Sequence, residues 1–135
     1  MVRILVVDDD RSVAYSIKTL LEYEGFDVAV AEDGGSAIVA AQADLYDVVI
    51  VDIFMPGMDG LATIAALRRD QPDLPIIAIS GFTLRDQEAP PTDVLAKAMH
   101  LGASCTLHKP FRRRDILDAV TACLDRAGAR ANDAA

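Results

Sequence analysis

The stretch "VVIVDIFMPGMDG", residues 48–60, begins as an unbroken apolar run and then stops at a carboxylate, Asp52. A short run that is apolar at every position is typical of a strand covered on both faces, as in a parallel sheet. Pro56 and Gly57 follow and favour a tight turn out of the strand. The stretch therefore predicts a buried parallel strand that ends at a charged side chain.

Similar apolar runs alternate with longer stretches of helical periodicity along the whole chain. The predicted strands are residues 3–9, 27–32, 47–52, 75–80 and 104–109. The first helix is indicated by a stripe of Val13, Ile17, Leu20 and Leu21, and the others are residues 34–43, 61–69, 92–101 and 115–124. Alternating strands and helices with short connections indicate right-handed crossovers. We therefore expect an α/β fold, doubly wound, with a parallel sheet.

Length and composition indicate one globular domain. The chain has 135 residues, 52% of them hydrophobic, which is enough to bury a core without disulfides or a structural metal. We assign residues 1–126 to this domain and residues 127–135 to a flexible C-terminal tail. The formal net charge of −8 argues against binding of nucleic acid or an anionic membrane through bulk charge.

Targeting and redox signals are absent from the sequence. The two cysteines, Cys105 and Cys123, lack CxxC spacing, and no signal-peptide pattern opens the chain. No apolar stretch approaches the roughly 20 residues of a membrane span. These features predict a cytoplasmic protein with reduced, structural cysteines.

Polar side chains follow the ends of several predicted strands. They are Asp8, Asp9 and Asp10 after the first strand, Asp52 at the third, Ser80 at the fourth and Lys109 at the fifth. Doubly wound sheets bind ligands at the carboxyl ends of their strands, so these side chains should converge on one rim.

Two unit charges about 4 Å apart repel by roughly 4 kcal/mol at an effective dielectric of 20, so clustered carboxylates need a cation or a raised pKa. Mg²⁺, with Mn²⁺ as an alternative, suits such oxygen ligands. A carboxylate beside a metal, a lysine and a hydroxyl is typical of a site that takes up a phosphoryl group.

In this order, the motifs "ILVVDDD", "DIFMPGMDG", "IIAISG" and "GASCTLHKPF" resemble the receiver domain of bacterial two-component response regulators. The resemblance covers almost the whole chain. It implies that Asp52 is the phospho-acceptor and a metal ligand, that Asp9 binds the metal directly and Asp8 through water, and that the backbone carbonyl of Phe54 is a further ligand. It also implies a flavodoxin-like, five-stranded sheet of order 2-1-3-4-5 with five helices.

The resemblance further assigns phosphate-binding and switch residues. Ser80 matches the switch hydroxyl, and Lys109 matches the invariant lysine that acts with the acceptor and is followed by a cis peptide bond to Pro110. Typical receivers carry Tyr or Phe three residues before this lysine, whereas here the switch position is Thr106. We expect Gly81 to serve as the hinge of a longer loop that replaces the missing ring.

The family also implies partners and a limited catalytic role. The phosphoryl donor would be a sensor histidine kinase or a histidine phosphotransfer protein, and the signal would pass to a downstream protein target through a changed binding surface. The protein would be a monomer or weak dimer that catalyses only its own Mg²⁺-dependent phosphorylation and dephosphorylation, and would not be a turnover enzyme. A stand-alone receiver and a fragment of a longer regulator would share this sequence.

Three alternatives remain open. The run of aspartates also fits a helix N-cap. "ILVVDDDRS" fits the strand-plus-DxD opening of haloacid-dehalogenase-like phosphatases, with Asp8 as nucleophile and Asp10 as general acid, although residues 52–60 would then have no role. A receiver-like binding module that never accepts phosphate is the third.

Overall fold

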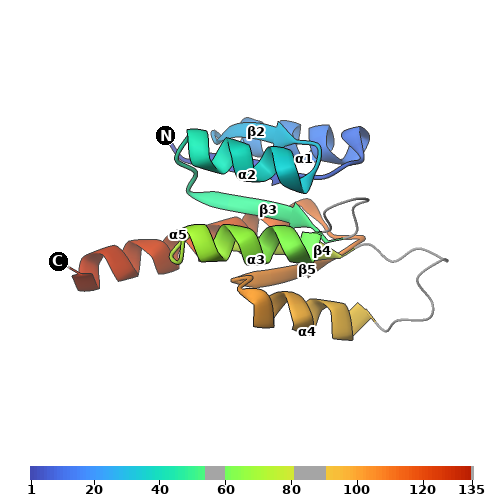
Figure 1. Cartoon of the computed structure of the whole chain (residues 1–135). Helices are drawn as coiled ribbons and strands as arrows, with labels where there is room; N and C mark the ends of the chain where they lie inside the picture. Colours follow the sequence, from blue (N-terminus) through green and yellow to red (C-terminus); the bar gives the residue numbers. More distant parts are fainter. Residues whose placement is uncertain (54–59, 81–90, 135) are drawn as a thin grey trace.

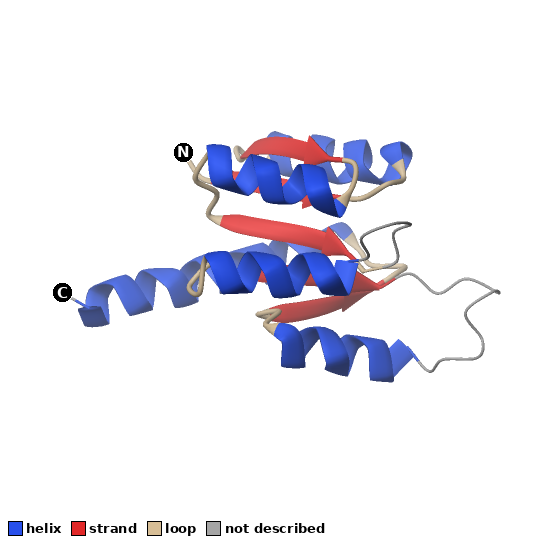
Figure 2. Cartoon of the chain, in the orientation of Figure 1, coloured by secondary structure: helices blue, strands red, loops and turns tan. Residues whose placement is uncertain are grey.

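The structure is a computed structural model of the whole chain, and it describes residues 1–53, 60–80 and 91–134; for residues 91–95 and 128–134 it describes the backbone. In these residues, five strands alternate with five helices (Figures 1 and 2). The strands are β1 (Arg3–Val7), β2 (Asp27–Ala31), β3 (Val48–Asp52), β4 (Ile76–Ser80) and β5 (Cys105–His108). The helices are α1 (Arg11–Tyr23), α2 (Gly34–Ala43), α3 (Gly60–Asp70), α4 (Pro91–Leu101) and α5 (Arg113–Ala134).

The strands form one parallel sheet in the order β2-β1-β3-β4-β5. This confirms the predicted doubly wound fold and strand order. Because every pair is parallel, all five strands point their carboxyl ends at the same edge of the sheet (Figure 2). Side chains that follow the strands are thereby gathered at that edge.

Helices cover both faces of the sheet, which explains why its strands are apolar at every position. Leu5, Val49 and Ile76 pack toward α2, α3 and α4, whereas Ile50 and Ile77 pack toward α1 and α5 (Figure 1). All five residues of β3, and all five of β4, are buried. Alternate residues of a strand therefore enter different cores, and apolar side chains dominate both.

Helix α1 shows how the local sequence sets an element beside the future site. Its N-cap is Asp10, whose carboxylate accepts hydrogen bonds from the backbone N–H groups of Ser12 at 2.9 Å and Val13 at 3.3 Å. The predicted apolar stripe is present, with Ile17 and Leu21 buried against the sheet. Only three residues separate the end of β1 from the start of α1, leaving a short connection at the carboxyl edge.

The C-terminal helix is longer than predicted. We expected a helix over residues 115–124 and a tail from residue 127, but the backbone of α5 is helical to Ala134 and its end runs past the sheet (Figure 1). Four of the eight residues from 127 to 134 are alanine, the strongest helix former, so local propensity continues the helix beyond its packed part. The domain boundary at residue 126 stays a prediction. Across the described residues, every helix is too short or too polar to span a membrane.

Gly60, the first residue of α3, lies against the end of β3. Its N–H donates to the carbonyl of Ile53 at 3.3 Å. A Cβ at this position would lie 2.8 Å from the carbonyl carbon of Asp52 and closer still to the Asp52 carbonyl oxygen and the Ile53 Cα. Only a hydrogen atom fits there, so a glycine lets α3 approach the backbone that carries Asp52.

We predict that Gly60→Ala lowers the free energy of unfolding by roughly 2–4 kcal/mol, because backbone atoms must shift to admit the methyl group. Gly35→Ala in α2 is the matched control, since a Cβ there meets only Asp33 Oδ1 at 3.5 Å. It should change stability by less than about 1 kcal/mol. Urea unfolding of both variants measures the difference, and equal effects would contradict the close approach.

Candidate functional site

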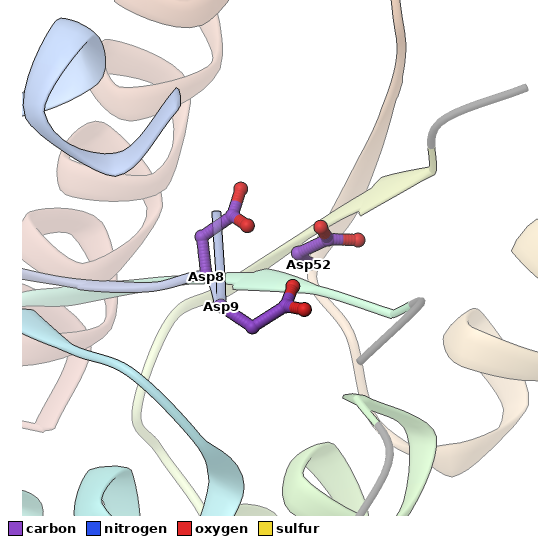
Figure 3. A group of neighbouring side chains, drawn as sticks. All are labelled: Asp8, Asp9 and Asp52. Atoms are coloured by element: carbon purple, nitrogen blue, oxygen red, sulfur yellow. The ribbon is translucent and has the colours of Figure 1, made fainter. Parts of the chain in front are cut away.

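Strand register brings Asp8 and Asp52 together. Val7 is paired with Val51, so the next residues of β1 and β3 lie side by side where the strands end. Asp8 and Asp52 are buried, at 2% and 6% exposure, and Asp9 is exposed. One carboxylate oxygen from each of the three lies within 4.8 Å of the others (Figure 3). The three predicted metal-site aspartates therefore form one cluster.

Lys109, the residue after β5, adds a positive charge to this cluster. Its Nζ lies 3.6 Å from Asp8 Oδ2 and 3.5 Å from Asp52 Oδ2, so it attracts both carboxylates. Its backbone N–H donates to the carbonyl of Ser80 at 2.7 Å, which ties the end of β5 to the end of β4. The Lys109-Pro110 peptide bond is cis, as the resemblance implies. One ammonium group faces three carboxylates, so the local charge remains negative.

Burial at this negative site alters the titration of Asp8. The pKa of Asp8 is raised to about 6, chiefly because burial removes the carboxylate from water and also because the charge of Asp52 lies nearby. The backbone N–H of Asp10, which donates to Asp8 Oδ1 at 2.9 Å, and the charge of Lys109 oppose the increase. The pKa of Asp8 is thus set by the cost of keeping a second buried charge beside Asp52.

The donor set fits a hard divalent cation. Three carboxylates from two strand ends present oxygen atoms to one point, and an ion there would offset the excess negative charge that raises the pKa of Asp8. Mg²⁺, or Mn²⁺ as the alternative, matches these ligands. The fourth predicted ligand, the carbonyl of Phe54, lies outside the described residues.

Ser80 brings an unused donor to the same edge. Ser80 is the last residue of β4 and is 1% exposed. It follows Ile79, which is paired with Asp52 on β3. Among the described residues, its Oγ is a buried side-chain oxygen with no hydrogen-bond partner. Buried hydroxyl groups are normally paired, so this one is available to donate to a group bound at the site.

The remaining predicted residues are separated from the cluster or lie outside the described residues. The carboxylate of Asp10 faces the N-terminus of α1, so the N-cap interpretation holds for this aspartate alone. Thr106, the predicted switch position, is half-buried in β5 opposite Ala78. Gly81 lies outside the described residues. The sequence analysis did not identify Gly60. A glycine directly before a predicted helix is the feature that could have indicated its close approach to β3.

Comparisons with known proteins agree with this geometry. The family model for the response regulator receiver domain matches residues 4–121. Response regulator MprA of Mycolicibacterium vanbaalenii is 38% identical over 125 residues, which cover 93% of this chain and 51% of MprA. Transcriptional regulatory protein PrrA of Mycobacterium tuberculosis is 35% identical over 129 residues, 96% of this chain and 52% of PrrA. The chain spans about half the length of these relatives.

Solved receiver domains have the same fold. A CheY-like receiver domain protein from Methanospirillum hungatei superposes with a TM-score of 0.84 at 26% identity, covering 96% of this chain and 98% of the other. The receiver domain of Francisella response regulator 1452 gives 0.81 at 30% identity, with 93% and 98% covered. The chain belongs to the response regulator receiver domain family, which confirms the predicted class of phospho-accepting receivers in two-component systems. The phosphatase alternative is not favoured.

The raised pKa of Asp8 predicts a pH dependence of stability in the metal-free protein. A carboxyl group whose pKa is about 6 when folded and about 3.9 when unfolded binds protons more tightly in the folded state, so stability falls as pH rises from about 4 to above 6. Asp8→Asn removes this loss. In EDTA at pH 7.5 the variant should be more stable than wild type by about 1–3 kcal/mol.

Urea unfolding at a series of pH values measures this difference, which should shrink toward zero near pH 4. Asp118→Asn, on the exposed side of α5, is the matched loss of one carboxylate far from the cluster. A gain for Asp8→Asn that is the same at all pH values, or matched by Asp118→Asn, would contradict the raised pKa.

Proposed function

We propose that this receiver accepts a phosphoryl group on the carboxylate of Asp52 and signals by changing a protein-binding surface. The observation that carries the proposal is the cluster of Asp8, Asp9 and Asp52 within 4.8 Å, with Lys109 Nζ beside two of them. A purely structural sheet edge gains nothing from buried carboxylates that repel one another. A phosphoryl-transfer site needs both the nucleophile and charged groups around it.

Asp52 is the nucleophile in this proposal. One of its carboxylate oxygens forms a bond to phosphorus while the phosphorus–nitrogen bond of a phosphohistidine donor breaks. The imidazole nitrogen leaves with the bonding electron pair and takes up a proton, and the product on Asp52 is an acyl phosphate. Among the three clustered carboxylates, Asp52 ends β3, and its neighbours Asp8 and Asp9 come from the adjacent strand end.

Lys109 and Ser80 stabilise the transferred group in this proposal. The ammonium group, 3.5 Å from Asp52 Oδ2, can pair with a phosphoryl oxygen as negative charge moves onto the Asp52 side chain. The buried hydroxyl of Ser80 has no partner among the described residues and can donate to another phosphoryl oxygen. Both residues stand at strand ends, so little reorganisation is needed to bring them to the phosphoryl group.

We assign Asp8, Asp9, Asp52 and the backbone carbonyl of Phe54 to hold Mg²⁺, with Mn²⁺ as the alternative. When bound, the ion supplies positive charge that offsets the phosphoryl oxygens and the carboxylates. We assign Asp9 as a direct ligand and Asp8 as a ligand through water, as the resemblance implies. Gly81 and Thr106 stay assigned to the switch that follows phosphorylation.

We propose a sensor histidine kinase or a histidine phosphotransfer protein as donor and a downstream protein as target, in the cytoplasm. One relative, PrrA, is named a transcriptional regulatory protein. The net charge of −8 of this chain does not favour direct contact with nucleic acid, so we propose that it acts through protein contacts, as a monomer or weak dimer. It catalyses its own phosphorylation and dephosphorylation and is not a turnover enzyme.

We predict that Asp52→Asn abolishes acid-labile phosphorylation, because an amide is a poor nucleophile and the other carboxylates are assigned to the metal. Intact mass after treatment with acetyl phosphate and Mg²⁺ measures the gain of one phosphoryl group. Asp8→Asn is the control and should still gain phosphate at raised Mg²⁺. A gain that persists in Asp52→Asn but disappears in Asp8→Asn would favour the phosphatase mechanism, and no gain in wild type would favour a module that never accepts phosphate.

We predict that Ser80→Ala separates function from stability. Removing a buried hydroxyl without a partner should leave the free energy of unfolding unchanged or raise it by up to about 1 kcal/mol. Phosphorylation by acetyl phosphate should slow by roughly fivefold, the equivalent of one lost hydrogen bond of about 1 kcal/mol. Equal phosphorylation rates, or a clear loss of stability, would contradict the proposed donor.

A further inference from the structure

A pair of thiols lies at the opposite edge of the sheet from the carboxylates. Cys105 is the first residue of β5, and Cys123 lies on α5, which packs against β5. Cys105 is half-buried, and Cys123 is 2% exposed; both belong to the core between the sheet, α1 and α5. They are the only two cysteines of the chain. The sequence predicted two separate structural thiols, whereas the fold places them together.

The two thiols interact directly and unequally. Hydrogen bonding between them lowers the pKa of Cys105 and raises that of Cys123. The charge of Arg126 lowers the pKa of both thiols. Arg126 is held beside the pair because its Nη1 donates to the carbonyl of Ser104, the residue before Cys105, at 3.3 Å. These opposite shifts favour Cys105 over Cys123 as the thiol that ionises first.

A cavity of about 300 Å³ gives small polar molecules access to this region. Its lining includes Cys123, Arg126, Ser104 and Arg68. Arg68 is engaged with backbone carbonyls, since its guanidinium donates to Gly102 at 3.0 and 2.6 Å and to Pro72 at 2.6 Å. Arg126 is exposed and borders both the cavity and the thiols. A small oxidant in this cavity thus meets Cys123 and Ser104, the residue before the half-buried Cys105, beside a guanidinium group.

We propose that Cys105 and Cys123 form a modification site that hydroperoxides convert into an intramolecular disulfide between β5 and α5. The Cys105 thiolate attacks one peroxide oxygen, the O–O bond breaks, and the released hydroxide takes up a proton. The Cys123 sulfur then attacks the resulting sulfenic acid of Cys105, the S–O bond breaks, and a second water leaves. Two thiols and hydrogen peroxide thereby give one disulfide and two molecules of water. The site does not depend on phosphorylation of Asp52.

The test exposes the reduced, folded wild-type protein to hydrogen peroxide and follows intact mass and alkylation with iodoacetamide. We expect a mass lower by two hydrogen atoms, loss of both alkylation sites, a Cys105–Cys123 cross-linked peptide after digestion, and reversal by dithiothreitol. The oxidised protein should also melt at a higher temperature, because the cross-link restrains the unfolded chain. The melting temperature of Cys105→Ser should not respond to peroxide.

The role of Arg126 is tested by the rate of disulfide formation. Arg126→Gln should slow it roughly threefold or more, because less of Cys105 is then thiolate. Arg126→Lys should retain most of the rate, and Arg114→Gln, an exposed position on the same helix, should not change it.

Four outcomes would overturn the proposal. They are two thiols that stay alkylatable after peroxide, a disulfide that joins two chains, oxidation of Cys105 beyond sulfenic acid without a cross-link, and an equal rate in Arg126→Gln and wild type.

Discussion

Repulsion among three carboxylates at the end of an apolar sheet is the constraint on which this receiver depends. Asp8 and Asp52 are buried next to one another, and a single ammonium group, from Lys109, lies within ion-pair distance of both. Burial first, and then the charge of Asp52, raise the pKa of Asp8 to about 6. The core must offset this cost, and it does so with strands such as β3 and β4, buried along their whole length. Because the carboxylates repel one another, this edge of the sheet favours the binding of a positive charge.

The strand order of the sheet brings residues that are far apart in the sequence together at this site. The order β2-β1-β3 makes β1 and β3 neighbours, and their register sets Asp8, the residue after β1, beside Asp52, the last residue of β3. The next two strands outward, β4 and β5, end at Ser80 and just before Lys109, and the Lys109 N–H holds those ends together. The groups that must meet a phosphoryl group thus stand at the ends of strands or one or two residues beyond them, which suits a reaction that depends on positioning.

Much of this arrangement could be predicted from the sequence, because apolar runs and helical stripes report burial directly. Strand limits fell within two residues of those observed, and the converging strand ends followed from the fold class. The three adjacent aspartates are chemically identical in sequence, and only the backbone separated Asp10, which caps α1, from its neighbours. The length of α5 and the close approach at Gly60 were missed, since one depends on alanine propensity beyond the core and the other on tertiary contact.

Strand β5 lies between the proposed phosphoryl site and the proposed thiol site. This strand has four residues, begins at Cys105, and ends one residue before Lys109. All four residues of this edge strand are paired with β4, and that pairing fixes its register. A covalent bond from Cys105 to α5 would therefore restrain the same element whose far end positions the Lys109 ammonium. The proposed phosphoryl site and the proposed thiol site thus lie at the two ends of one strand.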